Sequence, residues 1–286
     1  MNTFNRRSFI GRIAAGAGAA FGLAHLPSSL LANARSVEMP IGFQTFPIRE
    51  MLAKDLSGTL KMMAGLGYQT AEMCSPKGYA QIGYGPLVNI KPADLRKMIS
   101  DTGLSCFSCH FTFPEMGDQL DERIQFAHDL GLTQMICSTF WLPKTATLDD
   151  YLASADKLNV AAEKIKKAGM QTGFHNHEFE FHELGGQLIY DALMKRFDPS
   201  LVKMQFQTEV INLGYKASTY FDKYPGRFIS GHLSDWTADK KQVPVGQGVI
   251  DWKEFFTTAK TGGVKNIFVE MDLDTYKDSA SFIKSL

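Results

Sequence analysis

The chain has 286 residues, 44% of them hydrophobic, and its 30 basic residues balance its 30 acidic residues. This hydrophobic content is enough for a sizeable core. Because the charges cancel and no basic stripe is interleaved with aromatic residues, the sequence predicts no nucleic-acid partner.

The first 34 residues are predicted to be an export signal. A twin-arginine pattern at residues 5–10 precedes a small-residue apolar run at 13–24 and a cleavage signal, Ala-Asn-Ala, at 32–34. An amphipathic N-terminal helix of the domain is the weaker interpretation. We therefore expect residues 35–286 to form the mature domain in the periplasm, without a membrane anchor after cleavage.

The four cysteines could form disulfides in an exported chain. Cys106 and Cys109, the only close pair, lie three residues apart in a strand-like run, so their side chains should point to opposite faces. This spacing argues against both a disulfide and a zinc knuckle, and we expect free, mostly buried thiols.

Beyond the signal, short β-rich runs alternate with segments of helical length. The strand candidates, in chain order, are Ile41–Phe46, Gln69–Met73, Leu104–Phe111, Gln134–Ser138, Met170–His177, Val202–Thr208, Arg227–Leu233 and Asn266–Met271. The helical patterns between them include Asp55–Leu66, Lys91–Thr102, Gln119–Leu130, Asp149–Ala168, Ile189–Phe197 and Asp251–Lys260. Several helices end at a glycine, as a left-handed C-terminal cap requires: Gly67, Gly103, Gly131 and Gly169.

Eight βα units in about 250 residues match the size and order of a single (β/α)8 barrel. An open doubly wound sheet is the competing fold, but no strand is followed by the glycine-rich phosphate turn that opens a helix in that fold. In a barrel, the chemistry belongs at the C-terminal ends of the strands. Polar residues at those ends are therefore the candidates for a site.

Side-chain alternation selects inward-facing residues on three strands. On the fifth strand it puts Phe174 on an apolar face and His175 and His177 on the other. The apolar face would pack against the helices, so both histidines should point into the barrel mouth. The same alternation turns His232 of the seventh strand and Glu270 of the eighth inward.

Other strands add polar residues at the same end. Glu72 and His110 end the second and third strands, and Gln207 points inward on the sixth. Imidazole with carboxylate or amide oxygen is a donor set for a divalent metal ion such as Mn²⁺, Co²⁺ or Zn²⁺. A single inward histidine is as often a core residue, but grouping on at least five strands favours a metal site. His128 and His182 are interpreted as surface or outer residues.

Seven stretches carry a family resemblance: GFQTFPIRE, TAEM, FHNHEFEF, MQFQTEVINLG, GHLSDW, VPVGQGVIDW and FVEMD. Together they resemble the xylose-isomerase-like barrels, a superfamily of sugar isomerases and epimerases that also contains inosose dehydratase, endonuclease IV and keto-sugar lyases. The likeness covers essentially all of residues 35–286.

The resemblance implies one divalent metal ion held by the fifth to eighth strands, and the implied ligands are His175, Gln207, His232 and Glu270. Two of them depart from the family pattern, which often has glutamate at the position of His175 and aspartate at that of Gln207. This departure weakens the case for a two-glutamate proton shuttle. Two other carboxylates could replace a missing ligand, Glu180 and Glu209.

The activity implied by the resemblance is that of a metal-dependent sugar isomerase or epimerase acting through an enediolate. No Arg and Lys cluster marks a phosphate pocket, so the expected partner is an unphosphorylated small-molecule sugar or glycoside. Glu72, His110 and His177 are the candidate bases, because proton abstraction needs a group within hydrogen-bond reach. The alternatives are a 3-keto-glycoside lyase or hydratase and a sugar-binding barrel without catalysis. The sequence leaves the oligomeric state open.

Overall fold

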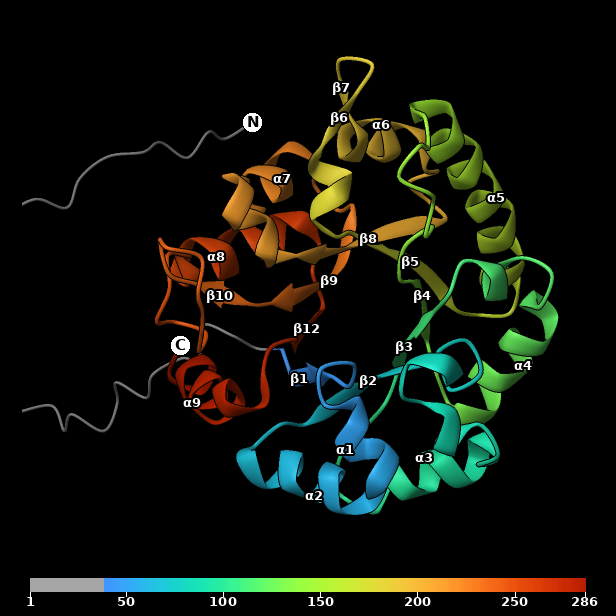
Figure 1. Ribbon diagram of the computed structural model, residues 1–286, viewed down its shortest axis with the longest axis vertical. Helices are drawn as coiled ribbons and strands as arrows, with labels where there is room; N and C mark the ends of the chain where they lie inside the picture. The colour runs from blue at the N-terminus through green and yellow to red at the C-terminus, as the bar shows by residue number, and fades with distance from the viewer. Residues whose placement is uncertain (1–38) are drawn as a thin grey trace, which may run out of the picture. The chain divides into compact units, whose positions relative to one another are not determined.

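The computed structural model of the protein describes residues 39–286 (Figure 1). The predicted export signal, residues 1–34, lies outside the described residues. Within the described range, no helix is both long enough and apolar enough to cross a membrane.

Eight parallel strands close into one barrel, which confirms the predicted single (β/α)8 fold (Figure 1). The order around the barrel is β1, β2, β3, β4, β5, β8, β9 and β12, and β12 pairs with β1. The strands are β1 (Ile41–Gln44), β2 (Thr70–Cys74), β3 (Ser108–Phe111), β4 (Gln134–Cys137), β5 (Gln171–His175), β8 (Val202–Gln207), β9 (Phe228–Leu233) and β12 (Asn266–Val269). All eight predicted strands are confirmed, and most are shorter than predicted because their last residues belong to the loops that carry the site.

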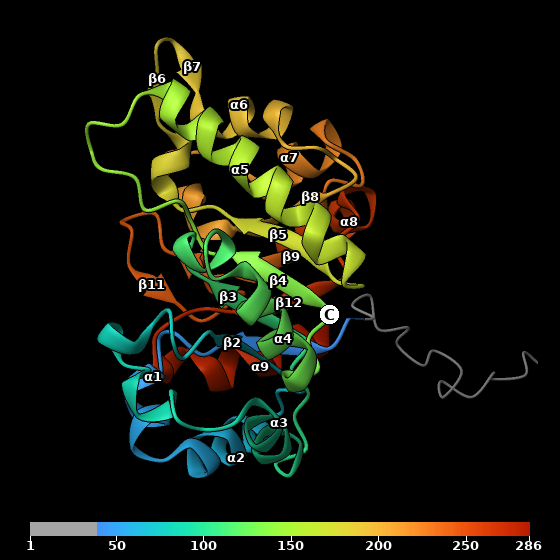
Figure 2. The same ribbon diagram turned by 90° about the vertical axis from the view of Figure 1, so that its right-hand side faces the viewer.

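Helices surround the barrel, and the side view shows α5 and α2 on opposite sides of the strands (Figure 2). The six predicted helices are confirmed as α2 (Leu56–Leu66), α3 (Pro92–Ser100), α4 (Leu120–Leu130), α5 (Leu148–Lys167), α6 (Ile189–Arg196) and α8 (Trp252–Gly262). Three further helices were not predicted: α1 (Arg49–Lys54), α7 (Ala217–Lys223) and α9 (Tyr276–Ser285). Two short antiparallel ribbons lie outside the barrel sheet, β6 (Glu183–Leu184) with β7 (Gln187–Leu188) and β10 (Asp235–Trp236) with β11 (Gln242–Val243).

The four glycines predicted to end helices, Gly67, Gly103, Gly131 and Gly169, all have positive φ angles. Gly67 and Gly131 cap the C-termini of α2 and α4 with φ angles of +97° and +86°. Backbone N–H groups of these caps close the last helical turns onto carbonyls of the preceding residues. A side chain with a Cβ is strained in this left-handed region, so glycine is the residue that lets the chain turn directly into the next strand.

The outward faces of the strands pack against the helices, as the alternation predicts. Phe174 of β5 packs against Phe140 and Phe197 with ring centroids 4.7 and 5.2 Å apart. Phe206 of β8 packs against Phe221 of α7 with ring centroids 5.8 Å apart. Each such ring contributes about 2–3 kcal/mol by leaving water. Because the apolar side chains of the strands point outward to the helices, the inward positions are available to polar side chains.

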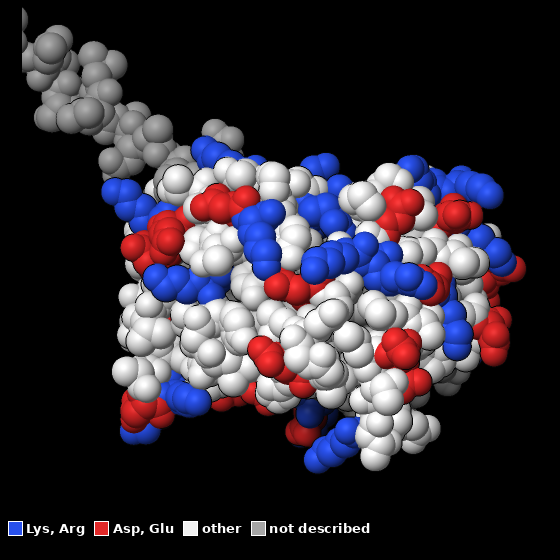
Figure 3. All heavy atoms as spheres, turned by 90° about the horizontal axis from the view of Figure 1, so that it is seen from above, with Lys and Arg blue, Asp and Glu red and all other residues white. Residues whose placement is uncertain are grey.

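The predicted state of the cysteines is confirmed. All four are free, with Cys74, Cys109 and Cys137 buried and Cys106 half-buried. On the face shown in Figure 3, acidic and basic side chains are intermixed, as expected from a chain without net charge.

A buried aspartate holds the loop that follows β11. The carboxylate of Asp235 accepts hydrogen bonds from the backbone N–H groups of Gly246 and Gly248 at 2.9 and 3.0 Å and from the indole of Trp252 at 2.8 Å. A Cβ at Gly248 would lie 2.1 Å from an oxygen of Asp235, so the loop approaches this closely only with glycine there. These contacts explain much of the stretch VPVGQGVIDW as a structural motif.

Candidate functional site

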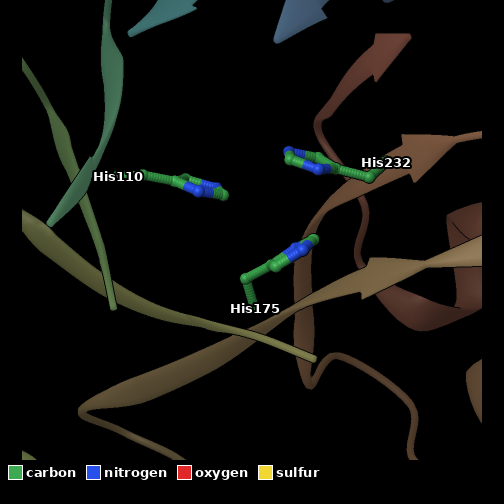
Figure 4. A group of neighbouring side chains, drawn as sticks. All are labelled: His110, His175 and His232. Carbon is green, nitrogen blue, oxygen red and sulfur yellow. The ribbon is translucent and has the colours of Figure 1, made fainter. Parts of the chain in front are cut away.

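Three buried imidazoles meet inside the barrel. His110 of β3, His175 of β5 and His232 of β9 turn toward a shared space (Figure 4). Each offers a ring nitrogen, and these nitrogens all lie within 4.8 Å of one another. The ring centroids are 5.0 Å apart for His110 and His175, 4.4 Å for His175 and His232, and 5.2 Å for His110 and His232. Parallel strands bring their C-terminal residues together, which is why three histidines distant in sequence form one group.

Glu72 of β2 is a fully buried carboxylate that accepts hydrogen bonds from four side chains. Its Oε1 accepts from Ser108 Oγ at 2.5 Å and from Gln205 Nε2 at 2.8 Å. Its Oε2 accepts from Gln44 Nε2 at 2.9 Å and from His232 Nε2 at 2.5 Å. Both oxygens are therefore occupied, and Glu72 lies in the protein interior rather than facing an incoming substrate.

His232 is held between two carboxylates. Its Nε2 faces Glu72, and its Nδ1 lies 2.7 Å from Oε2 of Glu270. Burial alone would lower the pKa of His232, but Glu270 and Glu72 outweigh it and raise the pKa to about 9. Burial likewise acts to raise the pKa of Glu72, yet His110 and His232 hold that pKa well below its ordinary value. A metal ion bound at one nitrogen of His232 would replace one proton and leave the other nitrogen on its carboxylate, as is common for histidine ligands.

Gln207 and Glu270 complete the predicted metal-binding set. Gln207 Nε2 donates to Glu270 Oε2 at 2.7 Å, and Gln207 Oε1 accepts from Ser234 Oγ at 3.2 Å. The structure therefore brings Gln207, Glu270 and His232 into contact, with the ring of His175 beside that of His232. The amide of Gln207, however, presents its N–H to Glu270 and keeps its oxygen on the far side.

The third candidate base, His177, lies at the mouth of the barrel, just beyond β5. It is half-buried, its ring stacks on Phe179 at 5.1 Å, and it meets the ring of His175 edge-on at 4.7 Å. Its Nδ1 has no hydrogen-bond partner among the described residues. Burial lowers its pKa to about 4, so the imidazole is neutral at neutral pH. Of the three candidate bases, Glu72 and His110 lie within the buried network, and His177 is the most accessible.

The two carboxylates considered as replacement ligands lie elsewhere. Glu180 is in the 3-10 turn Glu178–Phe181, where its Oε2 accepts from the backbone N–H of His177 at 2.7 Å and its Oε1 from Thr139 Oγ1 at 3.2 Å. It therefore clamps the loop after β4 to the loop after β5. Glu209 is half-buried, and neither residue belongs to the histidine group. His128 and His182 are exposed and outside the site, in line with their interpretation from the sequence.

Replacing Glu180 with glutamine is expected to stabilise the fold increasingly as the pH rises. Burial raises the pKa of Glu180 from 4.5 to about 8. Between these values the unfolded chain loses the proton while the folded chain keeps it, so wild-type stability falls with rising pH, by at most about 1.4 kcal/mol per pH unit. Glutamine resembles the protonated acid and lacks this dependence.

Thermal unfolding of wild type and Glu180→Gln at pH 5, 6, 7 and 8 measures the effect. The difference in Tm should grow across this range in favour of the variant. The control is Glu178→Gln, at an exposed position of the same turn, which should show no such trend. A Tm difference for Glu180→Gln that stays constant with pH would contradict the expectation.

Sequence reasoning missed several residues that support the site, among them Gln44, Ser108 and Ser234. A signal for one of them was available, because Ser108 precedes His110 by two positions and so shares its inward face. The contacts of Gln44 and Ser234 join different strands, and alternation within one strand does not reveal them.

Comparison with known proteins identifies the family. The family model of the xylose isomerase-like TIM barrel matches residues 60–286. The chain belongs to this family. A search of the curated proteins gave no match.

Several solved structures share the xylose isomerase-like fold. A sugar phosphate isomerase/epimerase from Parabacteroides distasonis ATCC 8503 is 23% identical, with a TM-score of 0.73 over 87% of this chain and 97% of that chain. D-psicose 3-epimerase from Clostridium cellulolyticum H10, solved with D-tagatose, is 13% identical, with a TM-score of 0.64 over 86% of this chain and 96% of that chain. A xylose isomerase-like TIM barrel protein from Mycobacterium smegmatis, in complex with magnesium, is 14% identical, with a TM-score of 0.62 over 87% of this chain and 97% of that chain. At these identities the likeness establishes the fold.

Proposed function

We propose that this xylose isomerase-like barrel is a divalent-metal-dependent enzyme that removes a proton beside the carbonyl of an unphosphorylated sugar. The observation that carries the proposal is the buried group of His110, His175 and His232 with a carboxylate at each nitrogen of His232. The sugar isomerases and epimerases among the similar structures support a sugar as the substrate class. The hydrogen-bond partners described for the site contain no Arg or Lys, which favours an uncharged sugar over a phosphorylated one.

The residues fit a divalent cation. Imidazole nitrogen and carboxylate oxygen are donors for Mn²⁺, Co²⁺ and Zn²⁺. His175 Nδ1 is buried and without a hydrogen-bond partner among the described residues, which is uncommon for a polar atom and would be resolved by an ion. His175 and His232 would hold the ion, with Glu270 beside them. When bound, it would supply Lewis acidity toward the carbonyl and neighbouring hydroxyl of the sugar.

His177 is the proposed base. It lies just beyond β5 and is half-buried, and its buried Nδ1, which has no hydrogen-bond partner among the described residues, would accept the proton. Stacking on Phe179 fixes the plane of its ring, and Glu180 holds its backbone. Glu72, a candidate base from the sequence, has both oxygens engaged, so we assign it the role of orienting His232.

Return of the proton to the opposite face of the same carbon gives epimerisation, return to the neighbouring carbon gives isomerisation, and loss of a β-leaving group instead gives elimination. One observation favours elimination from a 3-keto-glycoside as the second candidate. Oε2 of Glu270 is engaged by both Gln207 and His232 and both oxygens of Glu72 are engaged, which favours His177 as the base over a pair of carboxylates. Residues 1–34 support export by the twin-arginine route, and we propose a periplasmic location on that ground.

Solvent exchange tests the proposed function. The purified protein, supplied with Mn²⁺, Co²⁺ or Zn²⁺, is incubated in D₂O with free ketoses and with a 3-keto-glucoside, and metal content and deuterium uptake are measured. We expect about one bound ion per chain and deuterium at the carbon beside the carbonyl, with chelator slowing uptake by more than about 100-fold. A metal-loaded protein that binds sugar but exchanges no deuterium would be a sugar-binding barrel.

A further inference from the structure

We infer that the ion is held by the three imidazoles of His110, His175 and His232, and that Gln207 is a positioning residue for Glu270 and not a ligand. This inference rests on the proposed function and specifies which side chains bind the metal. Compared with the ligands implied by the family resemblance, it adds His110 of β3 and leaves out Gln207 of β8 and Glu270.

The spacing of the rings matches that of three ligands of one ion. A metal–nitrogen distance of about 2.0–2.1 Å and a tetrahedral angle at the ion put the centres of neighbouring imidazole rings about 5 Å apart. The observed separations of 5.0, 4.4 and 5.2 Å between the three rings agree with this value. The fit requires His110 as much as the other two histidines.

The ring of His110 is held in place by its own support. Its Nε2 lies 2.6 Å from Oε1 of Gln205. The amide nitrogen of Gln205 is in turn fixed by Glu72 Oε1 at 2.8 Å and Ser230 Oγ at 2.9 Å. Such partners are typical of metal-binding histidines, whose ring orientation is set by hydrogen bonds from outside the ligand set.

Gln207 is oriented against metal binding by partners on both sides. The backbone N–H of Glu209, which can only donate, lies 3.4 Å from Gln207 Oε1. Ser234 Oγ accepts from the indole of Trp236 at 3.3 Å, which leaves its hydroxyl proton for Gln207 Oε1. At the other end, Gln207 Nε2 donates to Glu270 Oε2 at 2.7 Å, so the amide turns its N–H toward this carboxylate. An N–H group has no lone pair for a cation.

The charges of the site also balance. Glu72 and Glu270 lie at the two nitrogens of His232, so their two negative charges offset the two positive charges of a divalent ion. The three imidazoles can then serve as ligands without a further carboxylate. The family aspartate is therefore dispensable at the position of Gln207.

Ligand variants of the full chain test the inference. Bound Co²⁺ or Zn²⁺ per chain is measured by elemental analysis, and the Kd by competition with a chelator, for wild type, His110→Ala, His110→Gln and Gln207→Ala. Both His110 variants should weaken binding by more than about 100-fold, beyond what loss of an outer partner costs, whereas Gln207→Ala should stay within about 10-fold. His128→Ala, at an exposed histidine, should leave the Kd unchanged.

The Co²⁺ form adds a readout that does not depend on activity. Its visible absorption bands should change in His110→Gln and be retained in Gln207→Ala, with circular dichroism showing that each variant is folded. Loss of metal in Gln207→Ala with full binding in both His110 variants would overturn the inference. If wild type binds the ion and exchanges deuterium yet the His110 variants bind normally, only this inference falls. A wild-type protein without metal and without exchange would refute the proposed function as well.

Discussion

Replacing His177 with alanine is expected to slow exchange of the proton beside the substrate carbonyl by about 10²–10⁴-fold, the range that a general base contributes. The bound metal should be retained, because His177 is not part of the buried histidine group. The measurement is deuterium uptake into the substrate by NMR, together with metal content of the same preparation. This combination separates the base from the ligands, since loss of a ligand would remove both.

The matched control is His182→Ala, an exposed histidine on the same loop, which should exchange at the wild-type rate. Loss of metal from His177→Ala would make His177 a ligand. Exchange at the wild-type rate would show that another group takes the proton. Glu270→Gln then distinguishes that group, because Glu270 is the half-buried carboxylate nearest the histidines.

The sequence alone predicts which of the site's side chains point into the barrel. Side chains alternate along a strand with a period of two, so the apolar Phe174 and Phe206 determine which neighbours point inward. His175 and His232 are accordingly inside the barrel, where alternation puts them. The barrel itself follows from the eightfold alternation of strand and helix patterns, a local signal repeated along the chain.

The roles within the site depend on contacts that local patterns do not contain. Ser234 determines whether the amide of Gln207 turns its oxygen or its N–H toward Glu270. Ser234 lies 27 positions away in sequence, directly after β9. The support of His110 comes from Gln205, 95 positions away, through a hydrogen bond across the barrel. The short helices α1 and α7 were missed for a related reason, since six or seven residues hold too few turns to show a helical period.

The choice between isomerisation and elimination depends on how many proton carriers face the substrate. An aldose–ketose shuttle or an epimerisation needs two well-placed carriers, one to take the proton and one to return it. Gln207 and His232 both hold Glu270 through its Oε2. His175 stands at the position where the family resemblance implies a common glutamate. Elimination needs one base, His177, and help for the leaving group. A 3-keto-glycoside also carries a carbonyl that stabilises the enolate left by proton removal.

We therefore expect the metal-loaded protein to release the aglycone from a 3-keto-glucoside at least about tenfold faster than it epimerises a free ketose, a difference of about 1.4 kcal/mol in activation free energy. Both substrates are incubated with the same Co²⁺- or Mn²⁺-loaded preparation, and the aglycone and the epimer are quantified by chromatography. His177→Ala should suppress aglycone release, because the same base begins the elimination. Rapid epimerisation of the ketose with the glycoside left intact would refute the lyase hypothesis and support an isomerase or epimerase. A second proton carrier would then have to act at the barrel mouth.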